Sequence, residues 1–285
     1  MKIYIDGDFY AKEDAKISVY DHGLLYGDGV FEGIRIYNDR IFRLKEHIKR
    51  LYLSAGAILL DIGITQDAMI TAVQKTVEAN KKKDGYIRLV VTRGVGNLGL
   101  NPFTCKKASI IIIVDDIQLY PEEHYEKGIS IITSSVRRIP PDSLDPRIKS
   151  LNYLNNIMAK TEAIQAGCLE ALMLNQQGYV AECTGDNIFY IKDRALFTPA
   201  SSLGALQGIT RDVVIEAAEK AGITFREAAT TTYDLYTSDE CFLTGTAAEM
   251  IPVVTIDGRT IGNGKPGEIT LDLKKAFMKS ITACE

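Results

Sequence analysis

A polar, proline-containing segment near the middle of the chain limits how it can fold. Residues 119–123 read Leu-Tyr-Pro-Glu-Glu and follow soon after the apolar, strand-like run from Ser109 to Val114. Proline is disfavoured inside strands, and polar stretches of this kind are typical of boundaries between domains. We therefore expect a small N-terminal domain over residues 1–117, an interdomain linker over 118–127 and a larger domain over 128–285.

Short strands and helices alternate on both sides of this segment, which predicts an α+β or α/β fold. Hairpins are expected where Asp6-Gly7 and Asn38-Asp39 separate strand-like runs. Helices are expected at residues 45–56, 65–82, 151–167 and 210–222, the last with Thr210 as its N-cap. Further strands are expected at residues 86–92, 109–114, 129–134, 170–175 and 187–191.

Charge and apolar patterning exclude several classes of function. The formal net charge of -4 gives no reason to expect nucleic acid or an anionic membrane as a partner. The most apolar run, Ile110 to Val114, is too short to cross a bilayer, and no signal peptide is apparent at the start. The five cysteines are not spaced like metal ligands or a redox pair. We expect free thiols, no metal site and a cytoplasmic location.

One glycine-rich motif has the spacing of a dinucleotide-binding loop. Residues 94–99 read Gly-Val-Gly-Asn-Leu-Gly and follow a predicted strand. In a true dinucleotide site a helix opens at the end of the motif, so that its N-terminal amides meet the pyrophosphate. Here Leu100-Asn101-Pro102 follows, and the proline disfavours such a helix. We interpret the motif as a flexible loop.

Two residues in the second half suggest cofactor chemistry. Lys149 stands shortly before a predicted helix in mixed apolar and amide surroundings, and Glu182 lies between two apolar strand-like runs. A partly desolvated lysine has a lowered pKa and can attack an aldehyde, while a buried carboxylate needs a cationic partner such as a protonated pyridine nitrogen. Taken singly, Lys149 is more readily explained as a surface lysine and Glu182 as an acid that caps a turn.

Two glycine and threonine segments could hold a phosphate. They are Gln207-Gly208-Ile209-Thr210, at a predicted helix start, and Leu243 to Glu249, which contains Gly245-Thr246-Ala247-Ala248. Helix N-terminal amides and hydroxyls bind phosphate well, although capping and turn roles explain the same residues. Arg50 could add a charge-assisted contact, or could be a solvated helix arginine.

These segments together resemble the class IV aminotransferases, which are fold-type IV pyridoxal 5′-phosphate enzymes, over nearly the whole chain. Within that family the resemblance is greatest to the branched-chain amino acid aminotransferases. It is carried by Val30-Phe31-Glu32-Gly33-Ile34-Arg35, Tyr86-Ile87-Arg88, Lys149 to Leu154, Glu182 to Asn187, Gly208 to Asp212 and Gly245 to Glu249. The resemblance implies a small N-terminal α/β domain and a larger C-terminal α/β pseudo-barrel domain.

The resemblance also implies a role for each matching residue. Lys149 would be the Schiff-base lysine, Glu182 would pair with the pyridine nitrogen, and Tyr153 would donate to the phenolic oxygen of the cofactor. The phosphate would be held by Arg50, Ile209, Thr210 and Thr246. The α-carboxylate of the substrate would be bound by Tyr86, Thr246 and Ala247, and its side chain by Tyr26, Phe31 and Arg88. The implied reaction is a ping-pong transamination between L-branched-chain amino acids and 2-oxoglutarate.

Related activities remain alternatives. D-amino-acid transaminases and aminodeoxychorismate lyases share Tyr26-Gly27-Asp28-Gly29-Val30 in outline, and an amine or broad-specificity transaminase is a further alternative. The D-amino-acid enzymes are similar to one another in an arginine and histidine carboxylate trap, whereas the corresponding loop here, Arg93 to Pro102, contains no histidine. The resemblance also implies a homo-oligomer, at least a dimer, in which a loop from the neighbouring subunit closes the site, and residues 94–99 are the candidate for that loop.

Overall fold

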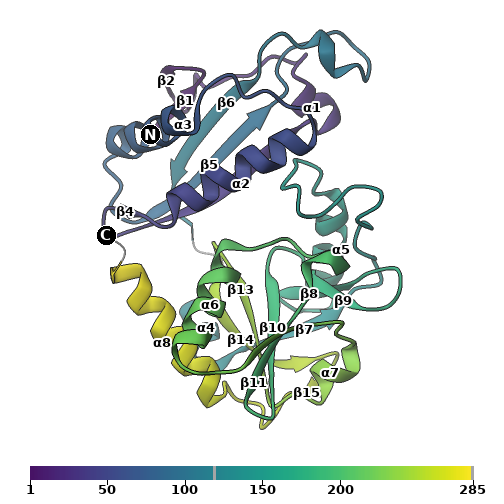
Figure 1. Cartoon of the computed structure of the whole chain (residues 1–285). Coiled ribbons are helices and arrows are strands. Elements are labelled where there is room, and N and C mark those ends of the chain that lie inside the picture. The colour runs from purple at the N-terminus through teal and green to yellow at the C-terminus, as the bar shows by residue number, and fades with distance from the viewer. Residues whose placement is uncertain (118–119, 284–285) are drawn as a thin grey trace. The chain divides into compact units, whose positions relative to one another are not determined.

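The computed structural model describes residues 1–117 and 120–283, which form two compact units. The first unit contains residues 1–117 together with a short later segment, Ile148–Asn152, and the second contains the rest of the described chain. Each unit has its own sheet and its own core (Figure 1). The sequence predicts residues 148–152 in the larger domain, whereas in the structure Ile148–Asn152 belongs to the first unit.

The first unit is built on a six-stranded sheet in the order β2-β1-β6-β5-β3-β4. All of its strand pairs are antiparallel. The strands are β1 (Lys2–Ile5), β2 (Asp8–Ala11), β3 (Gly29–Tyr37), β4 (Arg40–Ile41), β5 (Gly85–Thr92) and β6 (Ser109–Asp115). The helices are α1 (His22–Tyr26), α2 (Leu44–Ala57) and α3 (Gln66–Asn80), with a short 3₁₀ turn at Pro102–Thr104. Both predicted hairpins are confirmed.

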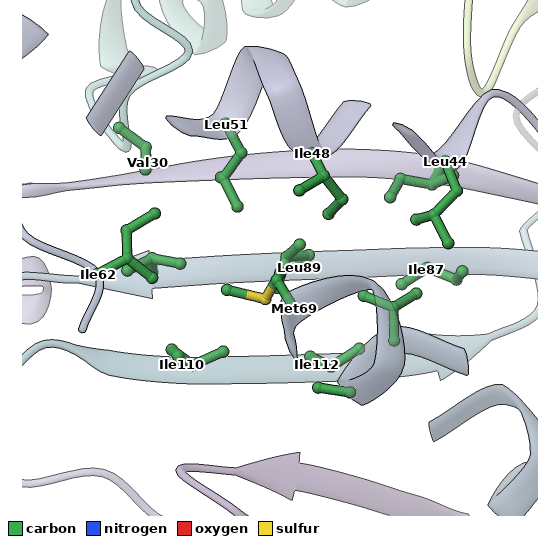
Figure 2. Packing of buried hydrophobic residues seen from close by; sticks show 14 of the residues in the cluster. Val30, Leu44, Ile48, Leu51, Ile62, Met69, Ile87, Leu89, Ile110 and Ile112 are labelled. Carbon is green, nitrogen blue, oxygen red and sulfur yellow. The ribbon is translucent and has the colours of Figure 1, made fainter. Parts of the chain in front are cut away.

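Strand alternation gives this sheet one apolar face. Val30, Ile34 and Ile36 of β3 share a core with alternate residues of β5 and β6 and with Ile48, Leu51 and Met69 of α2 and α3 (Figure 2). A fully buried side chain of this size contributes roughly 1.5–3 kcal/mol. Because successive strand residues point to opposite faces, Phe31, Gly33, Tyr86 and Arg88 belong to the other face. Helices α2 and α3 therefore cover one side, and Phe31, Tyr86 and Arg88 of the candidate site lie on the other.

The second unit is built on a mixed, nine-stranded sheet. Its main path is β12-β11-β10-β13-β14-β7-β8-β9, and β15 pairs with β14. The last strand of this path also contacts β10 and β11, so the sheet curls back on itself (Figure 1). The strands are β7 (Ile129–Thr133), β8 (Glu170–Leu174), β9 (Val180–Cys183), β10 (Asn187–Lys192), β11 (Ala195–Pro199), β12 (Phe225–Ala228), β13 (Glu240–Gly245), β14 (Glu249–Ile256) and β15 (Arg259–Thr260). This curled sheet matches the expected pseudo-barrel.

Five helices pack around the curled sheet. They are α4 (Glu122–Lys127), α5 (Leu154–Gln165), α6 (Ile209–Lys220), α7 (Thr232–Tyr236) and α8 (Glu268–Ala283), with a 3₁₀ turn at Ser201–Leu203. α5 packs against β8, α4 against β14, and α6 against β13 and α8. Within the described chain no helix is long and apolar enough to cross a membrane.

Two helices and the linker differ from the limits expected from the sequence. Helix α5 begins at Leu154 rather than Leu151, because residues 149–151 pair with β3 instead. Helix α6 begins at Ile209 with Gly208 as its N-cap, so Thr210 lies in the first turn and is not the cap. The expected linker includes helix α4, and its residues 118–119 lie outside the described part. The glycine loop is followed only by the 3₁₀ turn, as its proline indicates.

Candidate active site

Lys149 is held in the first unit by backbone hydrogen bonds to β3 and α2. The Phe31 N–H donates to the Lys149 carbonyl at 2.9 Å, and the Leu151 N–H donates to the Gly29 carbonyl at 3.0 Å. The Lys149 N–H donates to the Ser54 hydroxyl at 3.1 Å. Residues 149–151 thus act as a short additional strand beside β3. Lys149 is half-buried, so it is not a fully exposed surface lysine.

An aromatic and cationic surface surrounds the Lys149 amine. The Lys149 Nζ lies 4.4 Å from the ring centroid of Phe31. The Arg88 Cζ lies 4.6 Å from the same centroid and 5.4 Å from that of Tyr86. The structure therefore brings together four of the predicted site residues on one face of one sheet. Aromatic rings suit an aliphatic chain, and a guanidinium suits a carboxylate.

Gly33 makes room for Tyr86 on this face. β3 and β5 pair so that Gly33 faces Arg88 and Arg35 faces Tyr86. A Cβ added at Gly33 would lie 1.8 Å from the Tyr86 hydroxyl oxygen and 2.6 Å from its Cζ. Even the smallest side chain at this position would displace the tyrosine. The glycine of the Phe31-Glu32-Gly33 motif is thus explained by the ring that lies across it.

The core face of β3 carries a buried ion network that the sequence analysis did not identify as a unit. Glu32 is fully buried and binds the Arg50 guanidinium through both oxygens, at 2.8 and 2.7 Å. The His47 Nδ1 lies 2.7 Å from Glu32 Oε2. Arg50 is therefore fixed by Glu32 and is not a solvated helix arginine. The alternation of β3 and the His47 to Arg50 spacing on one helix face could have indicated this network.

Burial and charge act in opposite directions on the pKa values of this network. Burial raises the pKa of Glu32, but the charges of Arg50 and His47 and their hydrogen bonds outweigh burial and lower it to about 2. Burial lowers the pKa of His47, against the opposing effect of Glu32. The nearby charges of Arg50 and Lys149 lower the His47 pKa further. Glu32 is thus held as an anion by Arg50 and His47, while burial disfavours the charged form of His47.

Tyr26 is placed by the glycine loop of the same chain. The Gly99 N–H donates to the Tyr26 hydroxyl oxygen at 2.8 Å. The His22 ring stands edge-on to the Tyr26 ring at 5.0 Å, and its Nε2 lies 2.8 Å from the Asn97 carbonyl oxygen. Residues 94–99 therefore pack on α1, and they hold the tyrosine through its hydroxyl.

Glu182 lies in the second unit and is buried with a cationic partner. It is 5% exposed, and its Oε1 accepts from the Arg138 Nε at 2.9 Å. Its Oε2 accepts from the Leu206 N–H at 2.8 Å. A buried carboxylate needs a cationic partner, and Arg138 of the same chain provides one. Each oxygen has a second lone pair, so the carboxylate can accept one further donor.

The N-terminus of α6 has the features expected of an anion site. Its N-cap is Gly208, which has no side chain to bind the first-turn amides, and Ile209 and Thr210 are buried. A Cβ at Gly208 would lie 2.1 Å from the Asn187 Oδ1, so only glycine fits there. Uncapped N–H groups and the helix dipole favour a phosphate at such an end.

Thr246 and Ala247 lie in the tight turn between β13 and β14. Gly245 and Glu249 form the last pair of this hairpin, and Glu249 has a positive φ of 57°. A Cβ at Gly245 would lie 1.9 Å from the Asp186 Oδ1. Tyr153, the N-cap residue of α5, is half-buried in the same unit.

The groups present have the chemistry that pyridoxal phosphate requires. They include a half-buried lysine amine, a buried carboxylate with capacity for a further donor, and an uncapped helix N-terminus. These groups correspond to the aldehyde, the ring nitrogen and the phosphate of that cofactor. Within the described residues the structure shows no cluster of potential metal ligands.

Comparisons with known proteins give the same assignment. Residues 29–256 match the family model Amino-transferase class IV. A protein of Methanocaldococcus jannaschii, provisionally named a branched-chain-amino-acid aminotransferase, is 54% identical over 97% of this chain and 95% of its own length. A D-alanine aminotransferase of Bacillus licheniformis is 36% identical over 99% of this chain and 97% of its own.

Solved structures extend the likeness to the fold. The Escherichia coli branched-chain amino acid aminotransferase is similar with a TM-score of 0.95 at 36% identity, covering 98% of this chain and 93% of that one. The Thermus enzyme of the same name was solved with N-(5′-phosphopyridoxyl)-L-glutamate and with 4-methylvaleric acid. Its TM-score is 0.93 at 38% identity, over 99% of this chain and 94% of that one. The chain belongs to the class IV aminotransferases.

Proposed function

We propose that this protein catalyses pyridoxal-phosphate-dependent transamination between L-branched-chain amino acids and 2-oxoglutarate. The observation that carries the proposal is the set formed by Lys149, Phe31, Tyr86 and Arg88 on one sheet face. The names of the M. jannaschii, E. coli and Thermus relatives support the branched-chain assignment. The ligands of the Thermus structures, a glutamate adduct and an aliphatic acid, support a pocket that takes both kinds of substrate.

Each residue has a distinct task in this proposal. Lys149 would hold the cofactor through its amine, and as a free amine it would accept the proton of the substrate Cα and return it. The cofactor, when bound, supplies an electron sink for the bonds at Cα. Glu182 accepts from the ring nitrogen and Tyr153 donates to the phenolic oxygen. The phosphate is bound by Arg50, Ile209, Thr210 and Thr246.

Substrate selection rests on the contrast between aromatic and cationic side chains. Phe31 and Tyr26 contact an aliphatic side chain, whereas Arg88 pairs with the second carboxylate of glutamate or 2-oxoglutarate. Tyr86, Thr246 and Ala247 bind the α-carboxylate. Because Arg88 lies against Phe31, one pocket can present either a ring or a charge.

A D-amino-acid transaminase is the second candidate, because the B. licheniformis enzyme is also similar over nearly the full chain. A carboxylate trap in the loop after β5 would need a free cation there. Arg93 instead binds both Asp28 oxygens at 2.9 Å and donates to the Ile58 and Leu59 carbonyls. Because these contacts occupy the Arg93 guanidinium, it is not available to a substrate carboxylate. This favours the L-specific reaction.

An amino-donor panel tests the proposal. The purified enzyme with pyridoxal phosphate is offered both enantiomers of leucine, isoleucine, valine and alanine, with 2-oxoglutarate as acceptor, and glutamate is measured. Transfer from the L-branched-chain donors is expected. Transfer from D-alanine alone would establish the second candidate, and pyruvate released from aminodeoxychorismate without any transfer would establish a lyase.

The Gly33→Ala variant should weaken substrate binding. The added Cβ collides with the Tyr86 ring, and the strain of about 1–3 kcal/mol moves a residue that binds the α-carboxylate. We expect KM for leucine to rise roughly tenfold or more, since about 1.4 kcal/mol corresponds to a factor of ten. Gly56→Ala is the matched control, because a Cβ at that helical position meets no atom within 4 Å. Equal KM values in the two variants would show that Tyr86 does not contact substrate.

We also propose that two copies of the chain associate through an apolar surface on the first unit. Tyr20 and Gly96, and Tyr26 and Gly99, are joined by hydrogen bonds, so α1 lies beside residues 94–104. This paired surface exposes large apolar side chains: Val19, Tyr20, Leu24, Val95, Leu98, Leu100 and Phe103. A cluster of this kind marks an interaction site.

The double variant Leu100→Glu, Phe103→Glu is therefore expected to dissociate the assembly. Leu100 is 82% exposed and Phe103 78% exposed, so charges there leave the fold intact but oppose burial in an interface. Light scattering should show a fall to the 31.5 kDa monomer. Tyr233→Glu, at an exposed position of the second unit, is the control and should keep the larger mass. A wild-type protein that is already monomeric would contradict the proposal.

A further inference from the structure

Two neighbouring arginines of the second unit have opposite environments. Arg137 is exposed, whereas Arg138 is only 7% exposed. The Arg138 N–H donates to the Leu174 carbonyl at 2.9 Å, which anchors its backbone to the end of β8. A buried guanidinium is costly unless it is paired and hydrogen-bonded. The groups that contact the Arg138 guanidinium therefore indicate its role.

The Arg138 guanidinium is fixed by three side chains. Its Nε donates to Glu182 Oε1 at 2.9 Å, and its Nη1 donates to the amide oxygens of Asn155 and Asn156 at 3.3 and 3.2 Å. The two asparagine amide nitrogens donate in turn to the Arg137 and Thr184 carbonyls, at 2.9 and 2.8 Å. Both asparagines are thus oriented with their oxygens toward the guanidinium, so the arginine can approach Glu182 in only one way.

The second oxygen of Glu182 is held from another direction. Leu206 donates its N–H to Oε2 at 2.8 Å and accepts at its carbonyl from the Asn187 Nδ2, also at 2.8 Å. The segment from Leu206 leads directly into Gly208 and the uncapped N-terminus of α6. The carboxylate is therefore fixed on both oxygens and linked through a short stretch of chain to the proposed phosphate end.

Charge gives this arrangement a chemical consequence. A carboxylate buried without a cation tends to take up a proton, whereas an adjacent guanidinium favours the anion. Only the anion stabilises a protonated pyridine nitrogen, and the protonated ring is the better electron sink. We propose that Arg138 is a positioning residue that holds the Glu182 carboxylate in the orientation in which it binds the ring nitrogen of the cofactor. This inference rests on the proposed function and adds a residue that the family resemblance did not supply.

A ligand pair that differs only at the ring nitrogen tests the proposal directly. Binding to the apo chain is titrated with pyridoxal phosphate and with its analogue in which carbon replaces the ring nitrogen. The wild type should prefer pyridoxal phosphate. Arg138→Met should reduce this preference on the order of tenfold or more, in line with losses seen when supporting groups are removed from ligand-binding residues. Arg137→Met is the matched control and should leave the preference unchanged.

Two further variants separate positioning from simple support of the fold. If Arg138 acts through Glu182, Arg138→Met should add little to the loss already caused by Glu182→Gln. Arg138→Lys retains a charge but cannot reach both asparagines, so an intermediate preference is expected. Each preference is a ratio within one variant, so it does not depend on the fraction of protein that folds.

The possible outcomes separate a failure of the proposed function from a failure of the role given to Arg138. A wild-type chain that binds neither ligand would contradict the proposed function itself. A wild type that prefers pyridoxal phosphate, with Arg138→Met weakening both ligands equally, would overturn only the role given to Arg138. Independent, additive losses from Arg138→Met and Glu182→Gln would overturn it as well.

Discussion

Replacement of Lys149 by alanine is expected to abolish transamination while leaving the fold intact. The hydrogen bonds that hold residues 149–151 to β3 and Ser54 are all made by the backbone of Lys149 and Leu151, so alanine retains them. The side chain beyond Cβ is lost, and with its amine go both covalent attachment and proton transfer. We expect the rate of transfer from leucine to 2-oxoglutarate to fall by roughly 10³-fold or more.

Two measurements decide this prediction. The visible absorption of bound pyridoxal phosphate should lose its lysine-dependent band, and the thermal midpoint of the apo protein should stay close to that of the wild type. Lys45→Ala, at an exposed position of α2, is the matched control and should keep both band and rate. An unchanged band in Lys149→Ala would assign the covalent role to another lysine.

The Glu32→Ala variant should be among the most destabilising single changes in the first unit. It leaves Arg50 and His47 without the buried carboxylate that both contact. Removal of one partner from a buried ion pair costs about 3–5 kcal/mol. Chemical denaturation should show this loss, whereas Glu46→Ala removes an exposed pair with Arg43 and should cost at most about 1 kcal/mol. Equal losses in the two variants would contradict the role given to Glu32.

The same network predicts how stability depends on pH. The pKa of Glu32 is lowered to about 2, so its contribution is present above the ordinary range of a glutamate and is lost as pH falls toward 2. The lowered pKa of His47 acts in the same direction, because the unfolded chain takes up its proton first as pH falls. The lowering of the Glu32 pKa from 4.5 to about 2 corresponds to a contribution of about 3 kcal/mol to stability. In the Glu32→Gln variant, the free energy of unfolding should no longer fall as pH decreases below the ordinary range of a glutamate pKa.

Local signals in the sequence were sufficient for the hairpins and for most helices. Asp6-Gly7 and Asn38-Asp39 stand at the turns they predict, and apolar spacing located α2 and α3. The errors at α5 and α6 have a common cause, which is competition from partners distant in the sequence. Residues 149–151 are drawn into pairing with β3, and the Asn187 side chain requires glycine at the position before α6.

Candidate site residues could be proposed where several short segments occur together in one chain. Lys149, Glu182 and Gly208-Ile209-Thr210 were proposed in this way. Arg138 and His47 were not, because each acquires its meaning only from a carboxylate on another element. An arginine beside another arginine, or a histidine in an amphipathic helix, looks like a solvated residue until the strand that faces it is known.

The brief return of Ile148–Asn152 to the first unit makes the chain order of the two units interleaved. A cut after residue 117 would therefore not separate two self-sufficient pieces. The N-terminal fragment would lose the segment that pairs with Gly29 and Phe31, and the C-terminal fragment would carry Lys149 without the strand that places it. The chain passes between the two units three times, after residues 117, 147 and 152, and the placement of Lys149 depends on all of these connections being intact.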